Sequence, residues 1–265
     1  MLSRVTILIC GILLLAAGVS DADNNWRKST SRSDNNWHTP ANWSEGLPAA
    51  HYCNIGHDSE QPQGAGPTVS TSDATAGTVR MRSRVVEDPG LTLTITSTGH
   101  LTLTTGGLSV GFDTSTYGPK EMTVDVDGGM LTTTNLGIGE DYGSIAGTKG
   151  VVNILGGVVK ITNIESTALN FQNDPETSRV SELNLDATGL LYWNGDHTAS
   201  GDDKIATYIA ANQILGPGGA GAGDVHYELV TGGEYDGYTK VYIPEPATVA
   251  ILGLGSIALL RRRRV

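Results

Sequence analysis

A repeat of about 30 residues most strongly limits what this chain can fold into. From residue 91 onward, four segments each contain an alternating apolar run, a glycine and a second alternating run. The equivalent glycines are Gly99, Gly129, Gly157 and Gly189, separated by 30, 28 and 32 residues. Alternation of this kind places apolar side chains on one face of a strand and polar ones, here often threonine, on the other. The repeat therefore predicts an all-β fold, a parallel β-solenoid (β-helix) with about one coil per unit.

The segments between the strands complete this prediction. The repeated glycines suit corners that need a positive φ or a close approach between coils. Asp113–Lys120 and Asp141–Lys149 are rich in Gly, Ser, Thr, Asp and Tyr, so we expect loops there. Thr68–Arg80 is expected to supply an earlier, degenerate coil.

The segment before the repeats contains three tryptophans, Trp26, Trp37 and Trp43, set among asparagines and followed by Gly46 and Pro48. It resembles the N-terminal opening of many exported bacterial β-solenoid and autotransporter-adhesin-like proteins. We expect a cap in which the rings cover the first coil and the Asn side chains satisfy exposed backbone. The alternative is a sugar-stacking platform, because flat rings suit pyranose faces.

The segment after the repeats changes its pattern. Apolar residues at near-helical spacing predict one short amphipathic helix near 202–214, with Gly201–Asp203 as the N-cap region. A glycine-alanine loop over 216–223 follows. Val225–Val230 and Tyr238–Ile243 are expected to form two closing strands of a C-terminal cap that prevents edge-to-edge polymerisation.

The first residues have the features of a secretory signal peptide. Arg4 precedes an apolar run over 5–19 that is broken only by Thr6 and Cys10 and is too short to span a bilayer comfortably. Small residues fit a cleavage after Ala22, and a cleavage after Ser20 fits almost as well. Lipidation at Cys10 is disfavoured because Ile9 stands where a small residue is needed. Removal of the signal leaves Cys53 as the one cysteine, which excludes an intramolecular disulfide.

The extreme C-terminus combines Pro244, Glu245 and Pro246 with an apolar helix over 247–260 and four arginines. The arginines, Arg261, Arg262, Arg263 and Arg264, are expected to stay in the cytoplasm and orient the segment, since basic residues remain inside. Fourteen residues rise about 21 Å as a helix, a marginal membrane span. The alternative to the sorting signal described next is an ordinary tail anchor.

This order of Pro-Glu-Pro, short apolar segment and arginines resembles the PEP-CTERM sorting signal, which is also labelled an ice-binding protein C-terminal domain. The resemblance implies an exosortase as processing partner, transient insertion in the inner membrane, cleavage near Pro244–Pro246, and a final location in the cell envelope or outside the cell. It covers about 22 residues and does not extend to the body.

The chain thus divides into a signal peptide (1–22), a Trp/Asn-rich N-terminal cap (23–66), solenoid repeats (67–200), a helix with closing strands (201–243) and the sorting signal (244–265). Residues 23–243 hold 26 of the 28 acidic residues but 12 of the 17 basic ones. So acidic a body repels nucleic acid and anionic lipid.

Few residues suggest chemistry. Asp125 and Asp127 share one face of a strand, about 7 Å apart, and suggest calcium or acid/base chemistry, although acidic surfaces often carry such pairs. His51 and His57 flank Cys53, but the six histidines show no metal-ligand spacing. We therefore expect no catalytic residue, no metal and no cofactor.

The sequence leads to a non-enzymatic structural or interaction protein of the cell surface or extracellular polysaccharide matrix. The alternative is a carbohydrate- or ice-binding solenoid using rows of threonine: Thr92, Thr94, Thr96, Thr102 and Thr104. The rows are expected to be interrupted by Asp125, Asp127, Asn153 and Lys160, which argues against a large ice-binding plane. A polysaccharide-degrading enzyme, the third reading, requires acidic and basic groups converging on one face.

Overall fold

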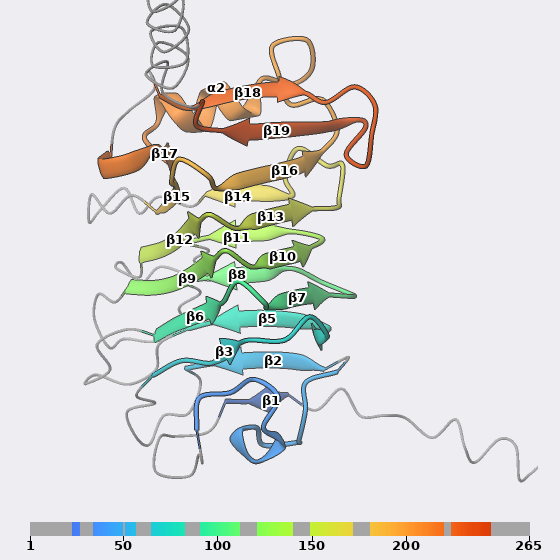
Figure 1. The fold of residues 1–265 in the computed structure, drawn as a ribbon, viewed down its shortest axis with the longest axis vertical. Coiled ribbons are helices and arrows are strands. Elements are labelled where there is room, and N and C mark those ends of the chain that lie inside the picture. The colour runs from blue at the N-terminus through green and yellow to red at the C-terminus, as the bar shows by residue number, and fades with distance from the viewer. Residues whose placement is uncertain are drawn as a thin grey trace, which may run out of the picture.

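The repeated segments wind into about five turns of a β-solenoid whose coils stack through parallel sheets (Figure 1). The computed structural model describes residues 23–26, 34–49, 51–56, 65–82, 91–111, 121–139, 149–171, 181–219 and 224–244. From β3 (Thr68–Val69) onward each complete coil contributes one strand to each of three sheets, here named sheets I, II and III in the order in which the coil passes through them. The predicted fold class is confirmed.

Sheet I takes the first strand of each coil. Its strands are β3 (Thr68–Val69), β6 (Leu91–Ile95), β9 (Glu121–Asp127), β12 (Lys149–Leu155), β15 (Glu182–Leu185) and β17 (Ile214–Leu215). They pair in parallel, with Leu93 opposite Val124 and Val152 opposite Leu183, so the inward apolar positions of successive coils stack on one another. The degenerate first coil expected over Thr68–Arg80 is present as β3 and its successors.

Sheet II takes the second strand of each coil and ends differently. Its parallel strands are β4 (Ala74–Ala76), β7 (His100–Leu103), β10 (Met130–Thr133), β13 (Val158–Ile161) and β16 (Leu190–Asn194). Beyond β16 the two expected closing strands, β18 (His226–Leu229) and β19 (Tyr238–Tyr242), form an antiparallel hairpin whose β19 pairs with β16. An antiparallel pair cannot continue the coil, so the hairpin ends the stack.

Sheet III takes a third strand that the sequence patterns did not predict. Its strands are β1 (Asn24–Asn25), β2 (Tyr52–Ile55), β5 (Thr78–Met81), β8 (Leu108–Val110), β11 (Leu136–Ile138) and β14 (Leu169–Phe171). Three of them are only three residues long, too short to show alternation by themselves. This third strand gives each coil its third side.

The four equivalent glycines lie where each coil turns from sheet I to sheet II, and there they are required by close approach. A Cβ at Gly129 would lie 2.3 Å from the carbonyl oxygen of Thr96, and one at Gly189 would lie 2.2 Å from that of Ile154. Positive φ belongs instead to the preceding glycine in the two shorter corners, Gly128 (+70°) and Gly156 (+72°). The sequence suggested two reasons for these glycines, a positive φ and a close approach between coils. The close approach explains the repeated glycine.

The N-terminal cap is built as predicted. Trp26, Trp37 and Trp43 are all buried beneath the first coil, with Trp43 meeting the other two edge to face at 4.9 and 4.8 Å. A loop containing the 3₁₀ turn η2 (Pro40–Asn42) is tied to β1 because the Asn24 amide donates to the Gly46 carbonyl and accepts from the Glu45 backbone N–H. Buried rings cannot stack on a sugar, so the platform alternative is wrong.

The C-terminal region contains the predicted helix, α2, over Lys204–Ala210. It is shorter than the pattern suggested because Asn212 adopts a positive φ of 55°, after which Ile214 enters β17. Tyr208 of α2 donates a hydrogen bond to the Leu169 carbonyl across 2.7 Å, so the helix covers the end of sheet III. The 3₁₀ turn η3 (Pro217–Gly219) lies in the expected loop.

In the described part of the chain, no helix combines the length and the apolar character needed to cross a membrane. The predicted signal peptide, the apolar segment over 247–260, and the loops over 113–120 and most of 141–149 lie outside the described residues.

Candidate ligand-binding groove

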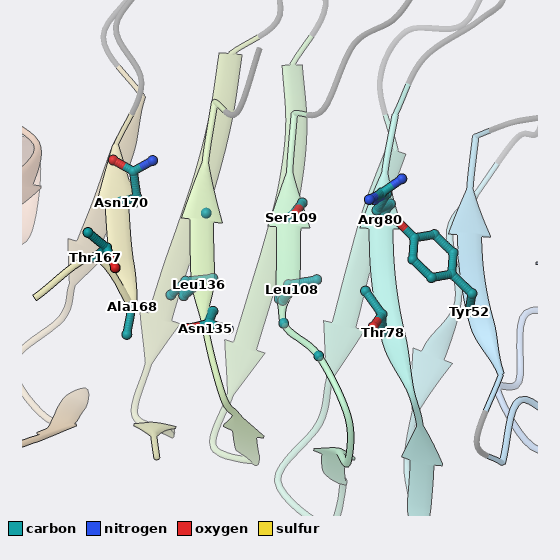
Figure 2. A pocket seen from close by; sticks show the side chains of 13 residues that line it. Tyr52, Thr78, Arg80, Leu108, Ser109, Asn135, Leu136, Thr167, Ala168 and Asn170 are labelled. Carbon is teal, nitrogen blue, oxygen red and sulfur yellow. The ribbon is translucent and has the colours of Figure 1, made fainter. Parts of the chain in front are cut away.

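A groove of about 460 Å³ runs across the outer face of sheet III. Side chains and backbone from β2, β5, β8, β11 and β14, and from the turns that precede them, line it (Figure 2). Since neighbouring strands lie about 4.8 Å apart, a groove crossing five strands extends for roughly 19 Å along the solenoid axis. The groove therefore suits an extended ligand that lies perpendicular to the strands.

The shape of the groove follows from small residues on the outward side of the middle strands. Outward positions in one row across the sheet are Arg80, Ser109, Gly137 and Asn170. Gly107 precedes β8, and a Cβ there would meet the Asn135 carbonyl oxygen of the next coil at 2.6 Å. Stacking of the coils thus forbids a side chain at position 107, which keeps this part of the groove floor open.

The two ends of the groove carry the larger polar side chains (Figure 2). At the N-terminal end the Arg80 guanidinium lies over the Tyr52 ring, 4.4 Å from its centroid. This cation–π contact holds a flat, five-donor group at the end of the groove. At the other end, Thr167 and Asn170 supply a hydroxyl and an amide. Donors and acceptors at the two ends frame a floor of backbone and short side chains.

The wall beside β11 is organised by hydrogen bonds between coils. The Asn163 amide donates to the Asn135 side-chain oxygen at 2.9 Å, and the Thr134 hydroxyl donates to the Gly106 carbonyl. The Thr133 hydroxyl donates to the Asn135 carbonyl at 2.7 Å. A wall held in this way is preorganised, which lowers the entropic cost of binding.

The groove differs from the rest of this acidic chain in its charge. None of its 13 lining residues is Asp or Glu, and the described strands of sheet III contain neither residue, whereas the chain has 28. Sheet I, in contrast, presents Glu121, Asp125, Asp127 and Glu182 on its strands. The described part of this face is therefore locally neutral to positive.

The five threonines of the sequence prediction lie on two faces and at their edges. Thr92 and Thr94 point outward from sheet I, and Thr102 points outward from sheet II. The Thr96 and Thr104 hydroxyls donate to the carbonyls of Val69 and Ala76, each at 3.2 Å. The structure does not bring the five onto one plane.

The interruptions of the threonine rows lie where they were expected. On sheet I the row of Thr94 continues through Asp125 and Asn153, and on sheet II the row of Thr102 continues through Thr132 to Lys160. The Asp125 carboxylate accepts a hydrogen bond from the Asn153 amide, which commits it to a contact within the fold. Its neighbour Asp127 is exposed at the end of β9.

The region around Cys53 offers no reactive thiol. Burial, together with the charge of Asp23, raises the pKa of the Cys53 thiol far above its ordinary value, so the thiolate is not formed at neutral pH. Its Sγ lies 3.5 Å from the His51 carbonyl oxygen. His57 lies outside the described residues, and within them no three His, Cys, Asp or Glu side chains gather in a way that suits a metal ion.

One smaller pocket, of about 320 Å³, lies under the β18–β19 hairpin and brings acidic and basic groups together. Glu228, Glu234 and Lys240 surround Tyr192, whose hydroxyl pKa is raised by burial and by the charges of both glutamates. The Tyr235 ring stacks on that of Tyr192 at 3.9 Å, and the Lys240 ammonium lies 3.8 Å from Glu228. The ring faces and the charged groups of this pocket therefore already contact one another within the protein.

Sequence reasoning missed the groove because its strands are the short third strands of the coils. A usable signal was present: every third-strand segment lacks acidic residues in an acidic chain. Of the predicted sorting motif, Pro244 is the last described residue, just after β19, while Glu245, Pro246 and the four arginines lie outside the described residues.

Comparison with protein families matches residues 243–264 to the PEP-CTERM protein-sorting motif. The chain therefore carries this motif, which marks it as an exosortase-targeted protein exported to the cell envelope or beyond. The match begins at Ile243, one residue after β19 ends. No curated protein matches the chain, and no solved structure matches it.

Proposed function

We propose that this chain, sorted through its PEP-CTERM motif, is a non-catalytic interaction protein of the cell surface or extracellular matrix that binds an extended glycan in the sheet III groove. The observation that carries the proposal is the groove itself, which crosses five coils and has no carboxylate among its lining residues or in the described strands of sheet III. Hydroxyl, amide and guanidinium groups there match the hydroxyls of a sugar chain as donors and acceptors.

A glycan fits better than the other extended polymers. Peptides commonly add as a strand to a free sheet edge, but β5, β8 and β11 are paired on both sides, and the Leu169 carbonyl of the terminal strand β14 accepts a hydrogen bond from Tyr208. Nucleic acid is disfavoured by a formal net charge of −11. A sugar chain is recognised mainly by polar side chains and ring faces, which is what the groove offers.

The absence of catalysis is part of the same proposal. Glycoside hydrolysis commonly uses two carboxyl groups on either side of the scissile bond, and the 13 lining residues include none. Before processing, we expect the segment over 247–260 to hold the protein transiently in the inner membrane. The exosortase then supplies the chemistry, acting on the tail.

Affinity electrophoresis of the exported, processed protein through gels containing candidate exopolysaccharides tests the binding. Ser109→Trp fills the middle of the groove from an outward position, while Thr123→Trp places the same ring outward on sheet I as a matched control. We expect retardation by a polysaccharide for the wild type and for Thr123→Trp, and its loss in Ser109→Trp. Equal retardation of all three proteins would overturn the groove as the binding site.

Deletion of the host exosortase tests the sorting. Intact mass spectrometry of fractions from cells with and without the enzyme is expected to show loss of the residues after about Pro244 only when it is present. An uncut tail in the inner membrane of both strains would contradict sorting and leave a membrane-anchored protein.

An ice-binding surface has less support. Along sheet II three threonines, Thr75, Thr102 and Thr132, follow one another before Lys160 and Tyr192 replace them. Such a short row does not provide the flat, regular plane that the alternative required.

A further inference from the structure

We propose that the C-terminal hairpin controls processing of the tail, because the exosortase can bind the sorting motif only after the end of β19 leaves the body. This inference rests on the proposed sorting and adds its regulation. It begins from the position of the motif. The family match starts at Ile243, directly after β19 ends, and Ile243 packs against the buried core. The first residues of the motif thus belong to the folded body.

The first step concerns how firmly the body holds β19. The strand lies between β16 and β18 and pairs with both. Its inward residues Thr239 and Val241 are fully buried, and the Thr239 hydroxyl donates to the Gly195 carbonyl at 2.7 Å. Pro244, the last described residue, is still half-buried. The chain therefore stays on the body up to the residues where cleavage is expected.

The second step concerns the length of chain between the body and the apolar segment. That segment begins at Ala247, so only Pro244, Glu245 and Pro246 separate it from the packed Ile243. Three residues span at most about 11 Å, even when fully extended. An enzyme that binds the backbone on both sides of the bond it cuts therefore needs Ile243 as well. The enzyme supplies the bond-breaking chemistry, and the body controls its access to the bond.

The third step concerns how the end of β19 can leave. Each coil of a solenoid contacts only its neighbours, so one end can open while the other coils stay folded. The hairpin lies at such an end, since β18 is the last strand of sheet II within the described residues and three of its four residues are exposed. When opening is fast relative to cleavage, the cleavage rate follows the population of the open form. The stability of the hairpin then sets the rate of processing.

Pulse-chase labelling of the full chain in its host measures how fast the precursor becomes the processed form. Val241→Ala removes buried methyl groups from β19, while Val79→Ala makes the same truncation in β5, near the other end. We expect processing at least about fivefold faster for Val241→Ala and at the wild-type rate for Val79→Ala. An unchanged rate for Val241→Ala, or an equal gain in both variants, would overturn the proposal. Absence of processing in every chain, the wild type included, would instead refute the proposed sorting.

A crosslink tests the closed hairpin without a destabilised variant. Leu190 of β16 lies opposite Tyr242, the last residue of β19. Cα atoms of such antiparallel neighbours lie about 4.5–5.5 Å apart, within the range that a disulfide spans. Leu190→Cys combined with Tyr242→Cys should slow processing at least about tenfold when oxidised, and a thiol reductant should restore the rate of Tyr242→Cys alone. Cys53, the one cysteine of the described chain, is buried and should not compete. Unchanged processing of the oxidised variant would show that the end of β19 need not leave the body, which would overturn the proposal.

Discussion

The amide of Asn153 donates a hydrogen bond across 2.8 Å to the carboxylate of Asp125, its neighbour on the preceding coil. Asn184 on the following coil donates in turn to the Asn153 side-chain oxygen at 2.9 Å. The three side chains form a ladder along sheet I that joins three coils. Side-chain ladders of this kind fix which residue of one coil faces which residue of the next.

Replacing the middle of this ladder tests its contribution. Asn153→Ala removes two hydrogen bonds and Asn184→Ala removes one, so we expect losses of about 2 and about 1 kcal/mol in the free energy of unfolding. Urea denaturation followed by circular dichroism measures both. Thr123→Ala, on the same outward face of β9, serves as the control. Equal losses for Asn153→Ala and the control would show that the ladder adds no stability.

The repeated glycine offers a prediction about shape. A Cβ at Gly157 would lie 2.6 Å from the Val126 carbonyl oxygen and 2.8 Å from that of Gly129. Gly157→Ala must push two coils apart, at a cost of about 3 kcal/mol, as overpacked interiors do. Gly218→Ala meets no atom within 4 Å but sits at a φ of 73°, so we expect a cost of about 1 kcal/mol. Thermal unfolding ranks the two, and the reverse order would contradict the close-approach explanation.

Asp186 stabilises one corner through its charge. Its carboxylate accepts hydrogen bonds from the backbone N–H groups of Gly156, Thr188 and Gly189. Burial by itself would raise the carboxyl pKa, but these hydrogen bonds outweigh it and hold the pKa below its ordinary value of 3.8. The stabilisation is therefore complete above about pH 3.8 and is lost as the pH falls through the lowered pKa.

Asp186→Asn should accordingly be less stable than the wild type at pH 6, by about 1 kcal/mol. Its midpoint of urea unfolding should approach that of the wild type as the pH falls below 3.8, because protonation removes the same charge from the wild type. A constant difference between the two proteins across this range would contradict the role of the charge.

His100 predicts a loss of stability in a different pH window. Its ring lies on the outer face of sheet II, with Nε2 3.0 Å from the Thr132 hydroxyl oxygen. Burial, and then the charge of Lys160, lower the pKa of His100 below its ordinary value of 6.5. As the pH falls below 6.5 the unfolded chain takes up the proton first, so stability decreases until the lowered pKa is passed.

His100→Asn removes this titration, and its unfolding midpoint should change less than that of the wild type between pH 7 and pH 5. Thermal unfolding at closely spaced pH values measures the difference. Identical profiles for the two proteins would show that His100 does not contribute in this window.

The sequence predicted the solenoid because a packed coil leaves a strong record: Leu93, Val124 and Val152 recur in register along sheet I. The sequence also predicted the tryptophan cap, because the first coil has no neighbour on one side and large rings can cover its apolar surface. The alternation of apolar and polar residues did not predict the groove. Ser109 and Gly137 are outward residues of three-residue strands, and only the stacking of coils places them between Arg80 and Asn170.

A mutation in the N-terminal cap tests whether its tryptophans stabilise the fold or bind a ligand. Trp43 is fully buried, packs against Trp26 and Trp37, and donates from Nε1 to the Trp37 carbonyl at 2.9 Å. Trp43→Ala should cost about 3–5 kcal/mol, as other truncations of buried rings do, and should expose the end of the first coil. We expect a lower thermal midpoint together with concentration-dependent association in analytical ultracentrifugation. Because the Trp43 ring does not line the groove, the molecules that remain folded should retain the glycan affinity of the wild type. Loss of that affinity without loss of stability would show that the tryptophans take part in binding.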